Sequence, residues 1–217
     1  MAEQLSARDL FRAAYENRYT WDQNFPGYTA DIQLRQGDQV FNGTIRISPE
    51  LTAEVSGVDD AAAKKSIQEQ AWEIAVHRVR RPFEVTHGQN TFEYGATDAS
   101  GAVEIIMGGK AAGDRYKVKD NVVTLVHRHI HGTVVTINTF STHQTEAGYL
   151  SHCYDSVYHD PNSGTQVKGP YQFEDLYDKV GDYYILTRRT ITGTENGQPL
   201  TTEFSFSNIR LLTPVLA

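Results

Sequence analysis

Apolar and polar residues alternate along much of this chain, as they do on strands with one buried face. Tyr28, Ala30, Ile32 and Leu34 alternate with polar side chains, and similar runs fill most of the chain after Phe83. Turn signals such as Asn-Gly and His-Gly pairs separate these runs. Strands at such short spacing predict an antiparallel meander and not a series of βαβ units.

Two segments break the alternation and have helical spacing instead. The first has an N-cap candidate at Ser6, and the second is rich in Ala, Lys, Glu and Gln and ends before Pro82. The sequence therefore predicts a single domain over residues 1–217, with a helix over 6–18, strands over 28–56, a helix over 59–81 and strands over 83–211.

The predicted fold class is α+β. We expect a long curved antiparallel β-sheet, a half-barrel or barrel of about eleven or twelve strands, wrapped around one or two helices. A chain of 217 residues is long enough to bury a large core without disulfides or metals.

One hairpin can be predicted in detail. If His131 and Gly132 form a two-residue turn, the strand pairs on its two sides follow by counting. One side then carries an aliphatic face and the other a histidine face. The aliphatic face holds Val126, Arg128, Ile130, Val135 and Ile137, and the histidine face holds His127, His129, Thr136 and Asn138. We expect the aliphatic face to line a core or a cavity.

Arg128 is the exception on the aliphatic face, because an unpaired guanidinium is costly to bury. Either it has a carboxylate partner or reaches solvent, or it holds an anionic group of a ligand. Nearby aromatic residues offer a wall for such a ligand, with Tyr154 and Tyr158 on one side of a further strand. An ordinary aromatic core is the alternative.

The run from His127 to His131 is the most distinctive motif. On a strand, His127, His129 and His131 share one face at a spacing of about 6–7 Å, from which neighbouring imidazoles can reach a common metal ion. His131 leaves this face if it lies in the turn. A polar outer face explains the same pattern without a metal.

Composition narrows the classes of function. The net charge of −7 lacks the basic footprint of a nucleic-acid-binding protein. A single cysteine, Cys153, allows no internal disulfide, and the N-terminal region lacks the apolar run of a signal peptide. No apolar stretch has the length of a transmembrane segment. These features predict a cytoplasmic protein.

Two stretches resemble the LolA-like (lipoprotein-carrier) superfamily. They are GYTADIQLRQGDQVFNGTIRISPE, two long strands ending at a proline, and VGDYYILTRRTITGTENGQPLTTEFSFSNIRL, a closing hairpin with Asn196 and Gly197 at its turn and Asn208 near its end. The resemblance implies an open half-barrel that holds acyl chains. The whole chain also resembles an uncharacterised family of about this length, associated with cyanobacteria and plastids.

These observations favour a non-catalytic binding or carrier protein that holds an apolar ligand (lipid, pigment or isoprenoid) on the concave face of the sheet, without a cofactor. Val126, Val135, Ile137, Tyr154 and Tyr158 would contact it, and Arg128, Arg188 or Arg189 would reach its polar head. Two alternatives stay open: a metal-binding enzyme that uses His127, His129 and His131, and an assembly or scaffold factor that acts on a protein partner through its surface.

Overall fold

A computed structural model describes residues 5–195 and 197–213 of the chain. Its helices are α1 (Ala7–Glu16), α2 (Ala61–His77) and α3 (Phe83–His87). Its strands are β1 (Tyr28–Gln36), β2 (Gln39–Ile47), β3 (Ala53–Ser56), β4 (Asn90–Thr97), β5 (Val103–Gly109), β6 (Arg115–Lys119), β7 (Val122–Ile130), β8 (Thr133–Thr139), β9 (Thr142–Thr145), β10 (Gly148–Ser151), β11 (Cys153–His159), β12 (Gln166–Val180), β13 (Tyr183–Glu195) and β14 (Gln198–Leu211).

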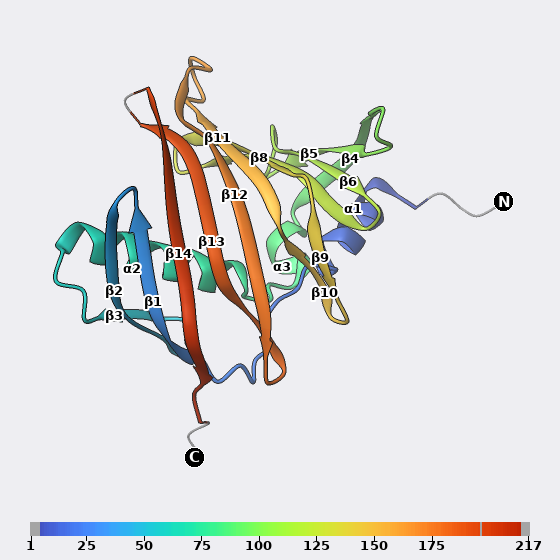
Figure 1. Ribbon diagram of the computed structural model, residues 1–217. Helices are drawn as coiled ribbons and strands as arrows, with labels where there is room; N and C mark the ends of the chain where they lie inside the picture. The colour runs from blue at the N-terminus through green and yellow to red at the C-terminus, as the bar shows by residue number, and fades with distance from the viewer. Residues whose placement is uncertain (1–4, 196, 214–217) are drawn as a thin grey trace. The chain divides into compact units, whose positions relative to one another are not determined.

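Over the described residues, twelve strands form one sheet in the order β3-β2-β1-β14-β13-β12-β11-β8-β7-β6-β5-β4 (Figure 1). β9 and β10 form a separate hairpin. The order has an edge strand at each end, so the sheet is not closed. The predicted α+β class, with a long antiparallel sheet of about this many strands, is confirmed.

The two main helices begin at capped residues. The backbone N–H of Asp9 donates to the Ser6 hydroxyl over 3.1 Å at the start of α1. At the start of α2, the N–H of Ala63 donates to the Asp60 carboxylate over 2.8 Å. These bonds satisfy N–H groups that have no partner within the helix. No helix in the described ranges is long and apolar enough to cross a membrane.

Two boundaries differ from the sequence prediction. α2 ends at His77 and not at Arg81, because the next residues join an extended segment: Trp21 N–H donates to the Arg78 carbonyl over 2.8 Å. The region predicted as strand from residue 83 begins instead with the short helix α3. Pro82 precedes it, and the Pro82 carbonyl accepts the N–H of Val85 over 3.1 Å, which closes a helical turn.

The described chain groups into two compact units. Of the described residues, unit 1 contains 5–19 and 81–172, and unit 2 contains 20–80, 173–195 and 197–213. β12 contributes its first residues to unit 1 and the remainder to unit 2. Each unit has its own helix and its own part of the strand order, and each is described by itself. The single domain expected from the sequence stays a prediction.

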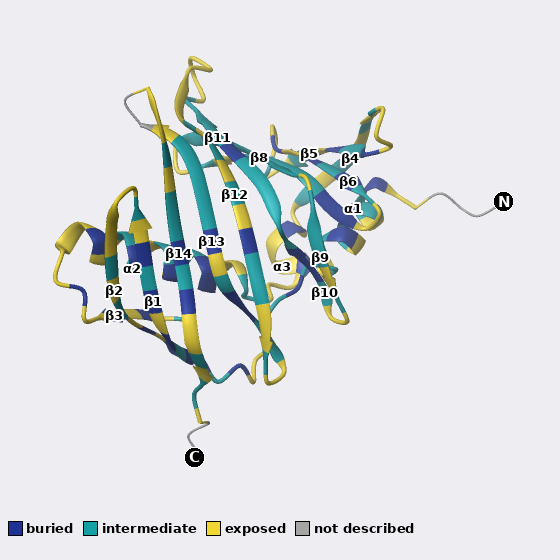
Figure 2. Ribbon diagram, in the orientation of Figure 1, coloured by how far each residue is buried: buried dark blue, intermediate teal, exposed yellow. Residues whose placement is uncertain are grey.

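The core of unit 1 lies between α1 and one face of its sheet. Phe11 of α1 is 1% exposed and packs against Phe83, Tyr116 and the ring of His87. Ile105 and other apolar residues of β5, β6 and β7 complete this cluster. Figure 2 shows buried positions along α1. The packing of Phe11 therefore holds α1 against this face of the sheet.

In unit 2, α2 packs against β2 and β3 and crosses the strands toward β13 (Figure 1). Its buried residues include Ile67, Ala71 and Ile74. β1 alternates strictly between more and less buried positions, as Figure 2 shows, so one of its faces belongs to this core. The indole of Trp21 stacks on Phe25 at a centroid distance of 3.9 Å and closes one end of the core.

Candidate functional site

The β7–β8 hairpin of unit 1 has the register predicted from the sequence. Val126 pairs with Ile137, Arg128 with Val135, and Ile130 with Thr133. His131 and Gly132 form the turn with φ values of 50° and 74°. Two consecutive positive φ values are those of a type I′ turn, whose twist matches the flanking strands.

The aliphatic face extends onto the next strand. β11 pairs with β8 so that Ser156 lies opposite Ile137, and Tyr158 lies opposite Val135. Directly paired residues share a face of a sheet. Six of the seven predicted ligand-binding residues therefore lie on one face of unit 1: Val126, Arg128, Val135, Ile137, Tyr154 and Tyr158.

α1 covers only part of this face. Its main contacts in unit 1 are with β4, β6, β7 and α3, and Val126 packs against the core cluster beneath it. Farther along the same face, Ile137, Tyr154 and Tyr158 are half-buried. The aliphatic face thus continues past the helix onto β8 and β11.

Arg128 has an acidic partner, which is one of the alternatives that the sequence left open. Its Nε lies 3.5 Å from Oδ2 of Asp114, and its side chain is 42% exposed. The two atoms form an ion pair, but Nε makes no hydrogen bond among the residues described. Ser156 Oγ, on the same face, is the other buried side-chain polar atom of the described chain without a hydrogen-bond partner.

Arg189, the seventh predicted ligand-binding residue, lies in unit 2 and is buried. Its Nε and Nη2 donate to the two oxygens of Asp175 over 2.8 and 2.7 Å. Its Nη1 donates to Gln70 over 3.0 Å and to Glu73 over 3.3 Å. Because these groups of α2 and β12 occupy the guanidinium, we do not include Arg189 in the candidate site.

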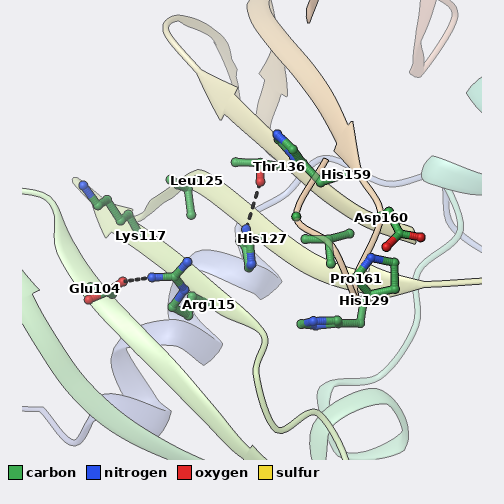
Figure 3. A pocket seen from close by; sticks show the side chains of 12 residues that line it. Glu104, Arg115, Lys117, Leu125, His127, His129, Thr136, His159, Asp160 and Pro161 are labelled. Carbon is green, nitrogen blue, oxygen red and sulfur yellow. Dashed lines mark hydrogen bonds and ion pairs between the residues drawn. The ribbon is translucent and has the colours of Figure 1, made fainter. Parts of the chain in front are cut away.

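The opposite face of the same strands, the histidine face, is hollowed. A cavity of about 690 Å³ opens over β6, β7 and β8 and is bordered by the end of β11 and the loop after it (Figure 3). All of its lining residues belong to unit 1. We call it the histidine hollow. Its side chains include Arg115, Lys117, His127, His129 and His159.

The two histidines of β7 are each held by a neighbour. His127 Nδ1 lies 2.9 Å from the Thr136 hydroxyl on the paired strand. His129 Nδ1 lies 3.2 Å from Oδ1 of Asp114, and its ring lies over Gly113, where a Cβ would come within 3.1 Å of the imidazole. These contacts orient both rings from their Nδ1 side.

The metal interpretation of these histidines stays a prediction. The His127 and His129 rings share a face as expected, with centroids 6.0 Å apart. His131 lies in the turn and not beside them. Within residues 5–195 and 197–213, no three His, Cys, Asp or Glu side chains are grouped closely enough to hold one metal ion.

Two basic side chains of β6, Arg115 and Lys117, line the hollow beside the histidines. Arg115 pairs in register with His127, and its Nη1 lies 3.7 Å from Glu104 Oε1. Lys117 Nζ is 2.7 Å from Asp98. Burial lowers the pKa of His127, and the nearby charges of Arg115 and His129 lower it further.

Sequence reasoning did not bring together four residues in and around the hollow: Arg115, Lys117, His159 and Asp114. Arg115 and Lys117 share a face by simple alternation, and this signal was in the sequence, but their position beside His127 depends on the β6–β7 register. His159 joins them only because β11 pairs with β8. Asp114 lies outside any strand, and no pattern in the sequence indicated that it contacts His129 and Arg128.

The fold and these two faces define an antiparallel-sheet protein with a helix on one face of the sheet in unit 1 and a histidine-lined hollow on the other. The chain belongs to the family described as "Protein of unknown function (DUF3386)", whose model matches residues 2–212. No curated protein matches the sequence.

The chain is similar to two solved structures over most of its length. One is an outer membrane lipoprotein-sorting protein domain from Vibrio parahaemolyticus, with 12% identity and a TM-score of 0.39 over 97% of this chain and 94% of that chain. Another is the LolA superfamily protein NE2245 from Nitrosomonas europaea, with 9% identity and a TM-score of 0.35 over 98% and 96%. At such identities and TM-scores, nothing about ligand or activity follows for this chain.

Proposed function

We propose that this chain is a non-catalytic binding protein that holds an apolar molecule with a polar end on the aliphatic face of unit 1. Val126, Val135, Ile137, Tyr154 and Tyr158 would contact the apolar part. Arg128 and Ser156 would hold the polar end. A lipid, a pigment or an isoprenoid fits this description.

The proposal rests on the position of two buried polar side-chain atoms that lack hydrogen-bond partners. Buried polar side chains in native proteins nearly always have hydrogen-bond partners, because an unpaired one costs about 1–3 kcal/mol. Among the described residues, Arg128 Nε and Ser156 Oγ lack such partners, and both lie on the aliphatic face. A ligand that presents oxygen acceptors would satisfy both groups.

The rest of the face suits the apolar part of such a ligand. Small-molecule sites are mostly apolar, with a few polar groups that set orientation. Around Arg128 and Ser156, the face offers aliphatic side chains of β7 and β8 and two tyrosines of β11. Tyrosine contributes a large apolar ring with a polar tip, which favours an amphiphilic partner.

The test is a fluorescence titration with 11-(dansylamino)undecanoic acid, which combines an acyl chain with a carboxylate. We expect wild-type protein to bind it and Ile137→Ser to weaken binding about tenfold, because a buried aliphatic contact is worth about 1.5–3 kcal/mol. Arg128→Gln should weaken binding of the acid more than binding of its methyl ester, since only the acid carries a charge.

Val157→Ser is the matched control. Val157 is also half-buried, lies on the same strand as Ser156 and faces the other side of the sheet. It should leave probe binding unchanged. Equal losses in Ile137→Ser and Val157→Ser, or a wild-type protein that neither binds the probe nor yields a lipid or pigment on solvent extraction, would overturn the proposal.

A further inference from the structure

The histidine hollow lies on the face opposite the proposed apolar site, and the proposed function does not use it. Its volume of about 690 Å³ falls within the range of small-molecule sites, roughly 300–1,000 Å³. It belongs to unit 1 alone, and strands of the sheet carry most of its side chains, while the loop after β11 supplies Asp160, Pro161 and Gly164.

The hollow differs in charge from the chain as a whole. The whole protein carries a net charge of −7, with histidines counted as neutral. Within the hollow, Arg115 and Lys117 balance the two carboxylates, Glu104 and Asp160, and three histidines add ring nitrogens. Asp160 is engaged by its own loop, where its Oδ1 accepts the N–H groups of residues 162 and 163. The hollow is therefore formally neutral on an acidic protein, and its basic side chains are the donors that a bound anion would meet.

Arg115 is the strongest donor available to a bound anion. Its closest carboxylate contact, Glu104 Oε1, is 3.7 Å from Nη1, which exceeds hydrogen-bond distance, and its side chain is 50% exposed. A guanidinium carries five N–H donors in a planar fork that matches the oxygens of a carboxylate or phosphate. Lys117 is less available, because Asp98 holds its ammonium at 2.7 Å.

The histidines add directed nitrogen atoms beside Arg115. Thr136 and Asp114 engage Nδ1 of His127 and His129, so each ring presents its Nε2 on the side away from that neighbour. Figure 3 shows His127 between Arg115 and His159. The positive charge of Arg115 next to His127 favours an anion over a metal cation at this position.

We infer that the histidine hollow is a second binding site, which takes a small organic molecule bearing a phosphate or carboxylate group. Arg115 would pair with the anionic group, and His127 and His129 would donate to it in their protonated or Nε2–H forms. Leu125 and Pro161, which also line the hollow, would contact the organic part.

The test uses phenyl phosphate and benzoate as probes and phenol as their uncharged counterpart. Binding is followed by calorimetry and by the shifts of the imidazole signals of His127 and His129 in NMR spectra. We expect the two anions to bind and to shift both histidines, and phenol to do neither. Arg115→Gln should weaken binding at least tenfold, because a hydrogen bond to a charged group is lost.

Two further variants separate the site from general charge effects. Lys110→Gln removes the same charge from an exposed loop residue outside the hollow and should change nothing. Lys117→Gln should weaken binding less than Arg115→Gln. Equal effects of Arg115→Gln and Lys110→Gln, or no shift of either histidine in wild-type protein, would overturn the inference.

A metal ion is the competing occupant, so Zn²⁺ is titrated in parallel. Zn²⁺ binding with shifts of His127 and His129, combined with no response to the anions, would also overturn it. Two variants separate this site from the apolar site. Ile137→Ser should keep full binding of phenyl phosphate and benzoate, and Arg115→Gln should keep full binding of the methyl ester of the dansyl fatty acid, which has no anionic group for the hollow.

Discussion

Asp114 and His129 are joined twice. The backbone N–H of His129 donates to Asp114 Oδ1 over 2.9 Å, and the His129 ring nitrogen Nδ1 lies 3.2 Å from the same oxygen. The other oxygen of Asp114 lies 3.5 Å from Arg128 on the opposite face of β7. One buried carboxylate thus positions a residue of the histidine hollow and a residue of the aliphatic face.

Removing this carboxylate should destabilise unit 1. We expect Asp114→Ala to lower the free energy of unfolding by about 1–3 kcal/mol, because the partly buried N–H of His129 loses its acceptor. Asp114→Asn keeps an oxygen for that N–H and should cost less. Urea denaturation measures both, and Glu93→Ala, an exposed position on β4, is the control. A loss no larger than that of Glu93→Ala would show that the contact contributes little.

Stability should depend on pH through His87. This ring is buried among Phe11 and Tyr15, and burial, assisted by the charge of Arg128, lowers its pKa from 6.5 to about 4. In the unfolded chain it takes up a proton at higher pH than in the folded one. The free energy of unfolding should therefore fall as pH drops from about 6.5 to 4, by about 2 kcal/mol after allowance for partial solvent screening.

NMR titration of the wild-type ring and urea denaturation across this pH range provide the measurement. His87→Gln should flatten the dependence, and His131→Gln, an exposed turn position, should not. A His87 signal that titrates near 6.5 would contradict the prediction.

The Arg189–Asp175 pair should be costly to break from one side only. Asp175 is 1% exposed and accepts two hydrogen bonds from Arg189. Arg189→Met leaves this carboxylate buried and unpaired, and we expect a loss of about 3–5 kcal/mol in the free energy of unfolding. The double variant Arg189→Met/Asp175→Leu should recover part of it.

Arg188→Met, at the exposed neighbour of Arg189, provides the comparison and should stay within about 0.5 kcal/mol of wild type. If Arg189→Met unfolds no more easily than Arg188→Met, the network with Gln70, Glu73 and Asp175 does not stabilise unit 2. Arg189 would then again be a candidate for contact with a ligand.

Local patterns were sufficient for the two main helices, for most of the strands and for one full hairpin. The His131–Gly132 turn and the alternation around it predicted every pair from Leu125–Asn138 to Ile130–Thr133. A two-residue turn fixes the register of the two strands, and the register fixes the face of the sheet on which each side chain lies. The short helix α3 was missed because five residues after a proline have too few turns to show a helical period.

The sequence by itself determined an antiparallel α+β fold and the two faces of β7 and β8, because side chains change sides at every residue along a strand. Only the tertiary structure decided which strands lie next to this hairpin. It brought Ser156 beside Ile137, and Arg115 beside His127, and it placed Arg189 in an internal network. Pairing between strands distant in sequence depends on packing across the whole sheet, and no local pattern records it.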